Sequence, residues 1–472
     1  MKNNANVESR RGFLKKIGLG ASVAVLASAC GRKSGEVADA LPVKSAGASE
    51  PEADGQMTYR LNNKGEKVSL LGYGCMRWPT MTDENDEEVI DQEQVNRLVD
   101  YAIEHGVNYF DTAPVYIKGK SEPATGIALH RHDRSEYQIA TKLSNSRGNH
   151  TFEEAVTMYR KSFVNLQVDY IDYYLLHNIG SGKDGKNGIE LFNERFVDNG
   201  VLDFLLKERE AGRIRNLGFS VHCDEKTFDH MMSLHDKYHW DFVQIQMNYV
   251  DWHNMEDGDA TAEYMYTRLA ERNIPVVIME PLLGGRLSNV PKYLAEQLQA
   301  HEPEKSIASW AFRFAGTYPG ILTVLSGMTY MEHLEDNLKA YSPLVSLTED
   351  ELALLEDIAG KYKDFGLVDC TGCQYCMPCP YGLDIPGIFA YYNKCVNEGS
   401  LKKDEGDPEY RKARRAFLQG YNSAVPKLRQ AEQCIGCKKC MKNCPQHIRI
   451  PKKMRMIEEY AEKLRAEWPD RL

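Results

Sequence analysis

Eight of the twelve cysteines lie in two short runs near the end of this 472-residue chain, and these runs limit its fold more than any other feature. Each run holds four cysteines and ends in Cys-Pro, and the two runs are Cys370, Cys373, Cys376, Cys379 and Cys434, Cys437, Cys440, Cys444. Cysteines separated by only two residues do not easily bridge one another, and disulfide frameworks are typical of much smaller scaffolds. Clustered metal ligands are therefore the better interpretation.

Two kinds of metal centre are compatible with such runs. Paired Cys-x₂-Cys units build four-cysteine zinc sites. The spacing Cys-x₂-Cys-x₂-Cys-x₃-Cys-Pro is instead that of bacterial iron–sulfur proteins. The second run has this spacing, whereas the first is one residue shorter before Cys379. Two runs of four that both end in Cys-Pro favour two [4Fe–4S] clusters over zinc.

The N-terminus carries a pattern typical of export. Ser9-Arg10-Arg11-Gly12-Phe13-Leu14-Lys15 precedes an apolar stretch over residues 17–29. That stretch is too short to cross a hydrocarbon core of ~30 Å, so it is interpreted as part of a signal peptide and not as a transmembrane helix. The motif resembles the twin-arginine (Tat) export signal, which implies a folded protein delivered to the periplasm or cell envelope.

Cys30 follows Leu26-Ala27-Ser28-Ala29, and this leaves two alternatives open. Either Cys30 carries a lipid anchor, or a signal peptidase cuts after Ala29. Residues 1–30 are thus predicted to be a signal peptide. Residues 31–56, rich in Ala, Ser, Gly, Glu and Pro, are predicted to be a flexible linker.

The rest of the chain is long enough for one large domain and one smaller domain. Its formal net charge of −10 argues against nucleic acid as a partner. From Met57 onward, short β-branched or aromatic runs alternate with amphipathic stretches, the pattern of repeated βα units. A hairpin is predicted over residues 59–69. Eight strands are then predicted to begin near Leu71, Asn108, Gln138, Ile171, Asn216, Phe242, Val276 and Leu322.

Helices are predicted between these strands, for example over Gln92–Glu104, Phe152–Asn165 and Thr261–Arg272. Eight such units over about 280 residues fit a TIM-type (β/α)₈ barrel better than an open doubly wound sheet. No Gly-x-Gly-x-x-Gly follows an early strand, which also argues against a Rossmann domain. The predicted fold class is α/β, with a barrel over residues 57–345 and a mostly α two-cluster domain over residues 346–472.

Ionisable residues stand where three of the apolar strands should end. These are Asp111, Lys142 and His177, and Tyr116 lies in the loop after Asp111. Such residues reach the C-terminal mouth of a barrel, where barrel enzymes keep their chemistry. A nearby lysine is expected to lower the phenol pKa from its reference value of ~10, with an aspartate holding that lysine charged. A histidine can orient a carbonyl or alcohol oxygen, so the set predicts proton transfer.

These four residues match, in order and local context, the catalytic tetrad of the aldo-keto reductases. The segment Leu71-Gly72-Tyr73-Gly74-Cys75-Met76 also resembles the first strand of that family. The resemblance covers roughly residues 57–345. It implies NAD(P)-dependent interconversion of a carbonyl and an alcohol on a small aldehyde, ketone or sugar, with Tyr116 as the acid/base.

The same resemblance implies the residues that would hold the nicotinamide cofactor. Ser220 and Gln244 would hold its carboxamide, Met279 and Leu282 would lie on its nicotinamide side, and Asn337 would lie at its adenosine end. In this chain Met279 replaces an aromatic residue that commonly stacks on the nicotinamide.

Two further departures weaken the expected grip on the cofactor. Val221 stands where the family often has an asparagine. Residues 326–329 and His333 replace a Lys-Ser pair and an arginine that usually bind the adenosine 2′-phosphate. Because charge-assisted contacts to phosphate are lost, NAD is favoured over NADP.

The cysteine runs resemble those of two-cluster bacterial ferredoxins, in which the fourth cysteine of each run crosses over. This implies a ferredoxin-like domain with two ligand sets. They are Cys370, Cys373, Cys376 and Cys444 for one cluster, and Cys434, Cys437, Cys440 and Cys379 for the other.

Three functional alternatives remain open at this point. In the first, an oxidoreductase passes electrons through its clusters to a partner protein. In the second, the chain is a regulatory module, as channel subunits of this family are, and the clusters only brace the fold. In the third, the nicotinamide is bound permanently, because free NAD is scarce outside the cytoplasm. Nicotinamide exchanges hydride pairs whereas clusters take single electrons, and no flavin motif bridges the two.

Overall fold

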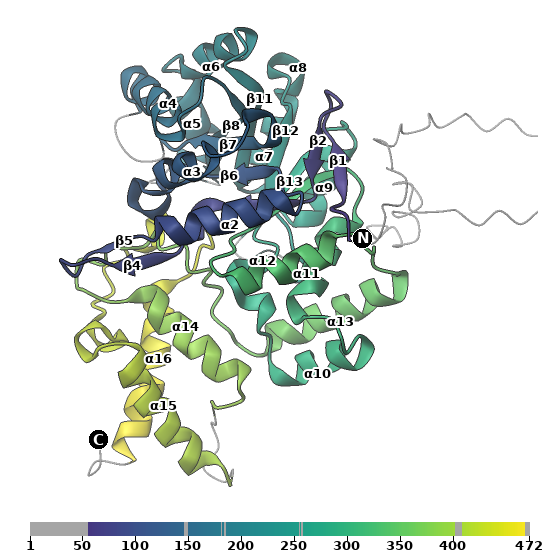
Figure 1. The fold of residues 1–472 in the computed structure, drawn as a ribbon. Helices are drawn as coiled ribbons and strands as arrows, with labels where there is room; N and C mark the ends of the chain where they lie inside the picture. The colour runs from purple at the N-terminus through teal and green to yellow at the C-terminus, as the bar shows by residue number, and fades with distance from the viewer. Residues whose placement is uncertain are drawn as a thin grey trace, which may run out of the picture. The chain divides into compact units, whose positions relative to one another are not determined.

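Eight parallel strands close into a barrel in the computed structural model of the chain (Figure 1). The strands follow the order β11-β12-β13-β14-β3-β6-β7-β8, and β8 pairs with β11 to close the ring. All eight begin within two residues of their predicted positions, so the predicted barrel is confirmed. They are β3 (Leu71–Gly74), β6 (Tyr109–Asp111), β7 (Gln138–Leu143), β8 (Ile171–Gly180), β11 (Ile214–His222), β12 (Phe242–Gln246), β13 (Val276–Met279) and β14 (Ile321–Ser326).

The structure describes residues 55–145, 150–180, 182–183, 186–253, 255, 258–401 and 408–467. All of them belong to one compact unit, Glu52–Leu472. The predicted signal peptide with Cys30, and the predicted linker up to residue 54, lie outside the described residues. Among the helices that are described, none combines the length and apolar character needed to cross a membrane.

Six of the helices that separate the barrel strands start at a residue whose side chain accepts a hydrogen bond from an amide of the first turn. Asp91 accepts a hydrogen bond from the Gln94 amide at the start of α2, and Thr151 accepts one from the Glu154 amide at the start of α4. The barrel-side helices are α2 (Gln92–Glu104), α3 (Ser121–Leu129), α4 (Phe152–Leu166), α5 (Gly188–Phe192), α6 (Val201–Glu210), α7 (Glu225–Ser233), α8 (His235–Tyr238), α9 (Ala262–Ala270), α10 (Lys292–His301), α11 (Ile307–Thr317) and α12 (Met331–Tyr341).

The predicted hairpin is present as β1 (Tyr59–Leu61) and β2 (Lys67–Ser69), which pair antiparallel. Two further hairpins were not predicted from the sequence. They are β4 (Thr80–Thr82) with β5 (Glu88–Ile90), and the two-residue strands β9 (Gly182–Lys183) and β10 (Lys186–Asn187). These strands are two or three residues long, and β4 carries only exposed side chains, so they give little hydrophobic pattern.

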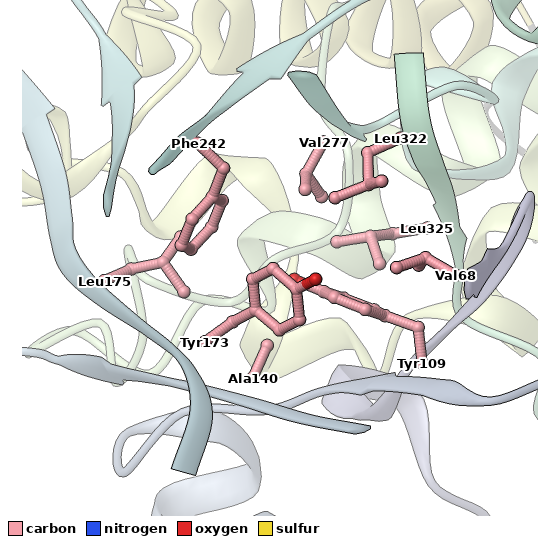
Figure 2. Close-up of a cluster of buried hydrophobic side chains, with 9 residues drawn as sticks. All are labelled: Val68, Tyr109, Ala140, Tyr173, Leu175, Phe242, Val277, Leu322 and Leu325. Carbon is pink, nitrogen blue, oxygen red and sulfur yellow. The ribbon is translucent and has the colours of Figure 1, made fainter. Parts of the chain in front are cut away.

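Apolar side chains from the strands fill the barrel (Figure 2). Tyr173 packs between Tyr109 and Phe242, with ring centroids 4.9 and 5.0 Å apart. Val68, from the hairpin, is fully buried in the same cluster, and Asn62 donates a hydrogen bond to the Tyr173 hydroxyl. The interior is therefore a packed core, which leaves the rim of the barrel for chemistry.

The C-terminal part is built from helices and short turns. It contains α13 (Glu349–Asp364), α14 (Ile385–Asn397), α15 (Tyr410–Ala424) and α16 (Ile450–Ala466), and no strand occurs among its described residues. Phe417 of α15 contacts Tyr460 of α16 at 4.9 Å between ring centroids. The two cysteine runs lie in the loops that precede α14 and α16, which confirms the predicted mostly α domain.

Candidate active site

The four predicted catalytic residues meet at one end of the barrel. Asp111 is the last residue of β6, Lys142 lies near the end of β7, and His177 lies in β8. Tyr116 opens a short helical turn in the loop after β6. Because parallel strands end at the same rim, the three strand residues converge, and the loop returns Tyr116 to them.

Lys142 and Asp111 form a buried ion pair. The Lys142 Nζ atom lies 2.5 Å from Asp111 Oδ1 and donates a second hydrogen bond to the Thr112 carbonyl at 2.7 Å. Lys142 is fully buried and Asp111 is 2% exposed. Burial lowers the pKa of Lys142, and the charge of Asp111 opposes that change. The aspartate therefore keeps the lysine charged and fixed in position.

Tyr116 stands between this pair and the histidine. Lys142 Nζ lies 4.8 Å from the centroid of the Tyr116 ring, and the ring of His177 meets it edge-on at 5.9 Å between centroids. Lys142 favours the tyrosinate, but it does not determine the net pKa of Tyr116. Burial, and then the charge of Asp111, raise this pKa well above 10. The resting side chain is therefore a neutral phenol, the form that donates a proton.

His177 is held in a neutral form. Its Nδ1 atom lies 2.5 Å from the Ser144 hydroxyl, so a substrate oxygen would be met by Nε2. Burial lowers the pKa of His177 well below 6.5, and the charges of Lys142 and Arg195 lower it further. A neutral imidazole can orient a carbonyl oxygen through a hydrogen bond without itself exchanging a proton with the substrate.

Ser144, Asn145 and Arg195 support this histidine and were not predicted. Arg195 donates to the backbone carbonyls of His177 at 2.6 Å and Asn178 at 2.8 Å, and it also bonds the Asn145 side chain. Ser144 follows Lys142 by two residues, so its side chain points to the same side as that of Lys142. This spacing could have predicted Ser144 as a site residue. Arg195 lies in a π-helical turn, Asn193–Val197, and no local pattern marks it.

The residues expected to hold a nicotinamide carboxamide are neighbours. Ser220 and Gln244 are direct partners in the pairing of β11 with β12. Gln244 is 2% exposed and its Oε1 atom has no hydrogen-bond partner among the described residues. Ser220 accepts a hydrogen bond from the Asn178 amide at 2.9 Å. The unpaired Gln244 oxygen at the rim can accept a hydrogen bond from a carboxamide. Ser220 and Gln244 therefore suit the nicotinamide end of the expected cofactor.

The other expected cofactor residues are more scattered. Met279 ends β13 beside Gln246, and Leu282 lies in the loop that follows. Asn337 is buried in α12 and donates to the Ser326 hydroxyl at 2.9 Å. Met279 therefore lies at the rim, whereas the side-chain amide of Asn337 is already hydrogen bonded to Ser326.

The eight clustered cysteines form the two groups that the crossing arrangement implies. Cys379 lines one cavity together with Cys434, Cys437 and Cys440. In the other group, burial raises the pKa of Cys376, and the neighbouring charges of Cys373, Cys370 and Cys444 raise it further. Each fourth cysteine thus lies beside the three cysteines of the opposite run.

These groups fit [4Fe–4S] clusters. A zinc ion draws four sulfurs to about 2.3 Å from one point, whereas a cubane cluster keeps its four thiolates apart. One of the two groups surrounds a cavity, as cluster ligands do.

The fold and its rim define a class, namely a (β/α)₈-barrel oxidoreductase that carries an iron–sulfur domain. Residues 70–359 match the family model described as the aldo/keto reductase family, and residues 369–449 match a 4Fe-4S dicluster domain. The chain belongs to the aldo/keto reductase family.

Similar proteins cover the barrel part. An uncharacterized oxidoreductase of Bacillus subtilis, YqkF, is 26% identical over 322 residues, which are 61% of this chain and 92% of that protein. The L-galactose dehydrogenase of Arabidopsis thaliana is 25% identical over 316 residues, 63% of this chain and 91% of that protein. A thermostable aldo-keto reductase solved with the inhibitor epalrestat shares the fold, with 22% identity, a TM-score of 0.50, and coverage of 64% of this chain and 100% of that one.

Proposed function

We propose that this chain interconverts a carbonyl and an alcohol on a small substrate at the barrel rim, with Tyr116 as the acid/base. The observation that carries the proposal is the buried contact of 2.5 Å between Lys142 and Asp111 beside the Tyr116 ring. A buried charge pair costs free energy to desolvate, so it is typical of sites where the charge is used.

The residues divide the proton chemistry between them. Tyr116 is neutral and donates the proton that the carbonyl oxygen takes up. The charge on Lys142 stabilises the tyrosinate as it forms, and Asp111 holds the ammonium in place. His177 orients the oxygen through Nε2, because Nδ1 is bound to Ser144. The reverse sequence oxidises an alcohol.

The two cysteine groups supply the electron path in this proposal. Clusters bound there would supply one-electron transfer, and they would relay electrons between the barrel and a partner protein. The first group lies within electrostatic range of the catalytic tyrosine, because the charge of Cys373 is the last of those that raise the pKa of Tyr116, after burial, Asp111, Cys75 and Glu280. Nicotinamide use is an expectation from the family resemblance, and Ser220 with the orphaned Gln244 acceptor suits only the carboxamide end of that cofactor.

The substrate class and the location are also proposals. A sugar is supported by the similarity to a dehydrogenase named for L-galactose. Tat export to the periplasm or cell envelope is supported by the twin-arginine motif, with Cys30 as a candidate lipid site. Fractionation of cells that carry Arg10→Lys and Arg11→Lys tests the export, because retention in the cytoplasm is expected.

The activity is tested with anaerobic holoprotein, reduced viologen as electron donor, and a panel of aldehydes, ketones and sugars. Wild-type protein should turn over at least one of these compounds. Tyr116→Phe should lose ~10²–10⁴-fold in rate, the usual effect of removing a general acid. Tyr293→Phe, at an exposed tyrosine of α10, is the matched control and should keep full activity. Equal rates for the two variants would refute the role of Tyr116, and a fully inactive wild type would favour a regulatory module.

A further inference from the structure

The first cysteine loop, residues 369–373, packs against the rim loop that follows β13. Arg286, in the turn Leu283–Ser288, forms an ion pair with Asp369 at 2.8 Å. A Cβ atom at Gly284 would lie 2.4 Å from the Cα atom of Thr371, and Thr371 is 4% exposed. Backbone therefore meets backbone here, with no layer of atoms between the loops.

Arg77, in the turn after β3, joins the same cysteine loop to the end of β14, the strand beside β13. Its Nη2 atom donates to the Thr371 carbonyl at 2.5 Å. A Cβ atom at Gly327 would lie 3.1 Å from the Cδ atom of Arg77, and the Thr329 hydroxyl donates to the Arg77 carbonyl. A continuous line of contacts thus runs from Gly284 through Thr371 and Arg77 to Gly327.

This line crosses the path expected for a dinucleotide. The family resemblance places Met279 and Leu282 on the nicotinamide side, and residues 326–329, His333 and Asn337 at the adenosine end. The two phosphates that join these ends would have to pass between residues 284 and 327. Thr371 and Arg77 already fill that space.

The second cysteine run reaches the rim as well. Gln446, two residues after Cys444, donates to Gln246 Oε1 at 3.1 Å. It also lies 3.2 Å from Glu280 Oε2, so it bridges the ends of β12 and β13.

The two arginines at the rim are already bound to the cysteine loop. Arg286 has an 8% exposed side chain and its charged partner is Asp369. Arg77 is bound to the backbone of Thr371. A Cβ atom at Gly372 would lie 3.6 Å from the Arg77 Nη2 atom, so Arg77 faces the first cysteine run. The two arginines carry the charges that a pyrophosphate would need.

We infer that residues 369–373 close the dinucleotide groove of the barrel, and that the holoprotein does not bind soluble NADH or NADPH. The first cysteine group then takes the place beside the barrel rim that the dinucleotide has in the rest of the family. This inference goes beyond the proposed function, because the role of Tyr116 does not depend on which carrier supplies the electrons.

Binding is measured by titrating anaerobic holoprotein with NADH and with NADPH and following nucleotide fluorescence. No saturable binding is expected up to about 1 mM of either nucleotide. The holoprotein is also denatured and its nucleotide content measured, and far less than one dinucleotide per chain is expected. Gln244→Leu is the matched variant, because it removes the orphaned carboxamide acceptor without touching the cysteine loop.

A weak fluorescence change that is the same in wild type and Gln244→Leu would come from outside the groove and would support the inference. A saturable signal that Gln244→Leu weakens tenfold or more would overturn it. About one dinucleotide per chain in the denatured extract would also overturn it, because the cofactor would then be resident in the groove. Neither contrary result would touch the Tyr116 test, which uses a viologen as donor.

Discussion

The barrel and the cysteine loops reach a defined structure by different means. The barrel closes eight strands around a core in which Tyr109, Tyr173 and Phe242 are fully or almost fully buried. The second cysteine loop has only short turns, and Ile435 beside Cys434 is 63% exposed. Apolar burial therefore specifies the first region, whereas the second is specified by the positions of its ligands.

Iron removal should produce the largest difference between the two regions. A chelator is expected to abolish viologen-linked turnover and to open both cysteine loops, because their structure depends on the ligand bonds. The barrel should remain folded. Limited proteolysis of the treated protein should cut within residues 366–449 and leave a resistant fragment of the barrel. Unfolding of the barrel at the same chelator concentration would contradict the comparison.

Lys142→Met tests how much the barrel depends on its buried ion pair. The change leaves Asp111 as an uncompensated buried charge, so a loss of about 3–5 kcal/mol in the free energy of unfolding is expected. Adding Asp111→Leu removes that charge and should restore most of the stability. Denaturant unfolding followed by tryptophan fluorescence measures both variants. If Lys142→Met alone were as stable as the wild type, the ion pair would not be desolvated.

Gly284→Ala tests the contact between the two regions. The new Cβ atom would meet the backbone of Thr371, so a loss of about 1–3 kcal/mol from overpacking is expected. Gly285→Ala is a close control, because Gly285 also has a positive φ but has open space around its Cβ position. Thermal unfolding of the two holoproteins isolates the contact from the backbone strain. Equal losses would mean that the cysteine loop does not press on the rim.

A smaller effect is expected from pH, at Glu280. Burial, and then the charge of Asp251, raise the pKa of Glu280 from 4.5 to about 8. Between these values the folded protein holds a proton that the unfolded chain has lost, so stability falls as pH rises through this window. Glu280→Gln should remove this part of the pH dependence. Melting temperatures of the two proteins should therefore diverge from pH 4.5 to pH 8, and parallel curves would contradict the shift.

The sequence was sufficient for the periodic parts of the barrel. Strand β8 holds the run Tyr173–Leu176 directly before His177, and α2 has the bounds that its amphipathic pattern predicts. The tetrad could be predicted because each strand residue follows such a run. The cysteine runs could be predicted because their spacing is local.

The remaining features depend on contacts between distant segments. The pKa of Tyr116 rises because several elements bury its side chain. The sequence around Tyr116 does not show that distant segments cover it. Arg195 reaches His177 from a π-helical turn. The contact of Thr371 with Gly284 joins residues of two different domains. Such contacts leave no periodic signal in the sequence.

If the tetrad and the clusters act as one redox site, a substrate should reoxidise the reduced clusters. Measuring this reoxidation is the most direct test. Holoprotein is reduced, freed of excess reductant and mixed anaerobically with a carbonyl substrate from the panel, with no dinucleotide present. The clusters are followed by electron paramagnetic resonance and the alcohol product is quantified. Each alcohol takes two electrons from the clusters and two protons, one from Tyr116 at the oxygen and one from solvent at the carbon. Wild-type clusters should therefore reoxidise as alcohol forms, and Tyr116→Phe should slow both by ~10²–10⁴-fold. Equal reoxidation rates in the two proteins, or alcohol formed while the clusters stay reduced, would contradict it.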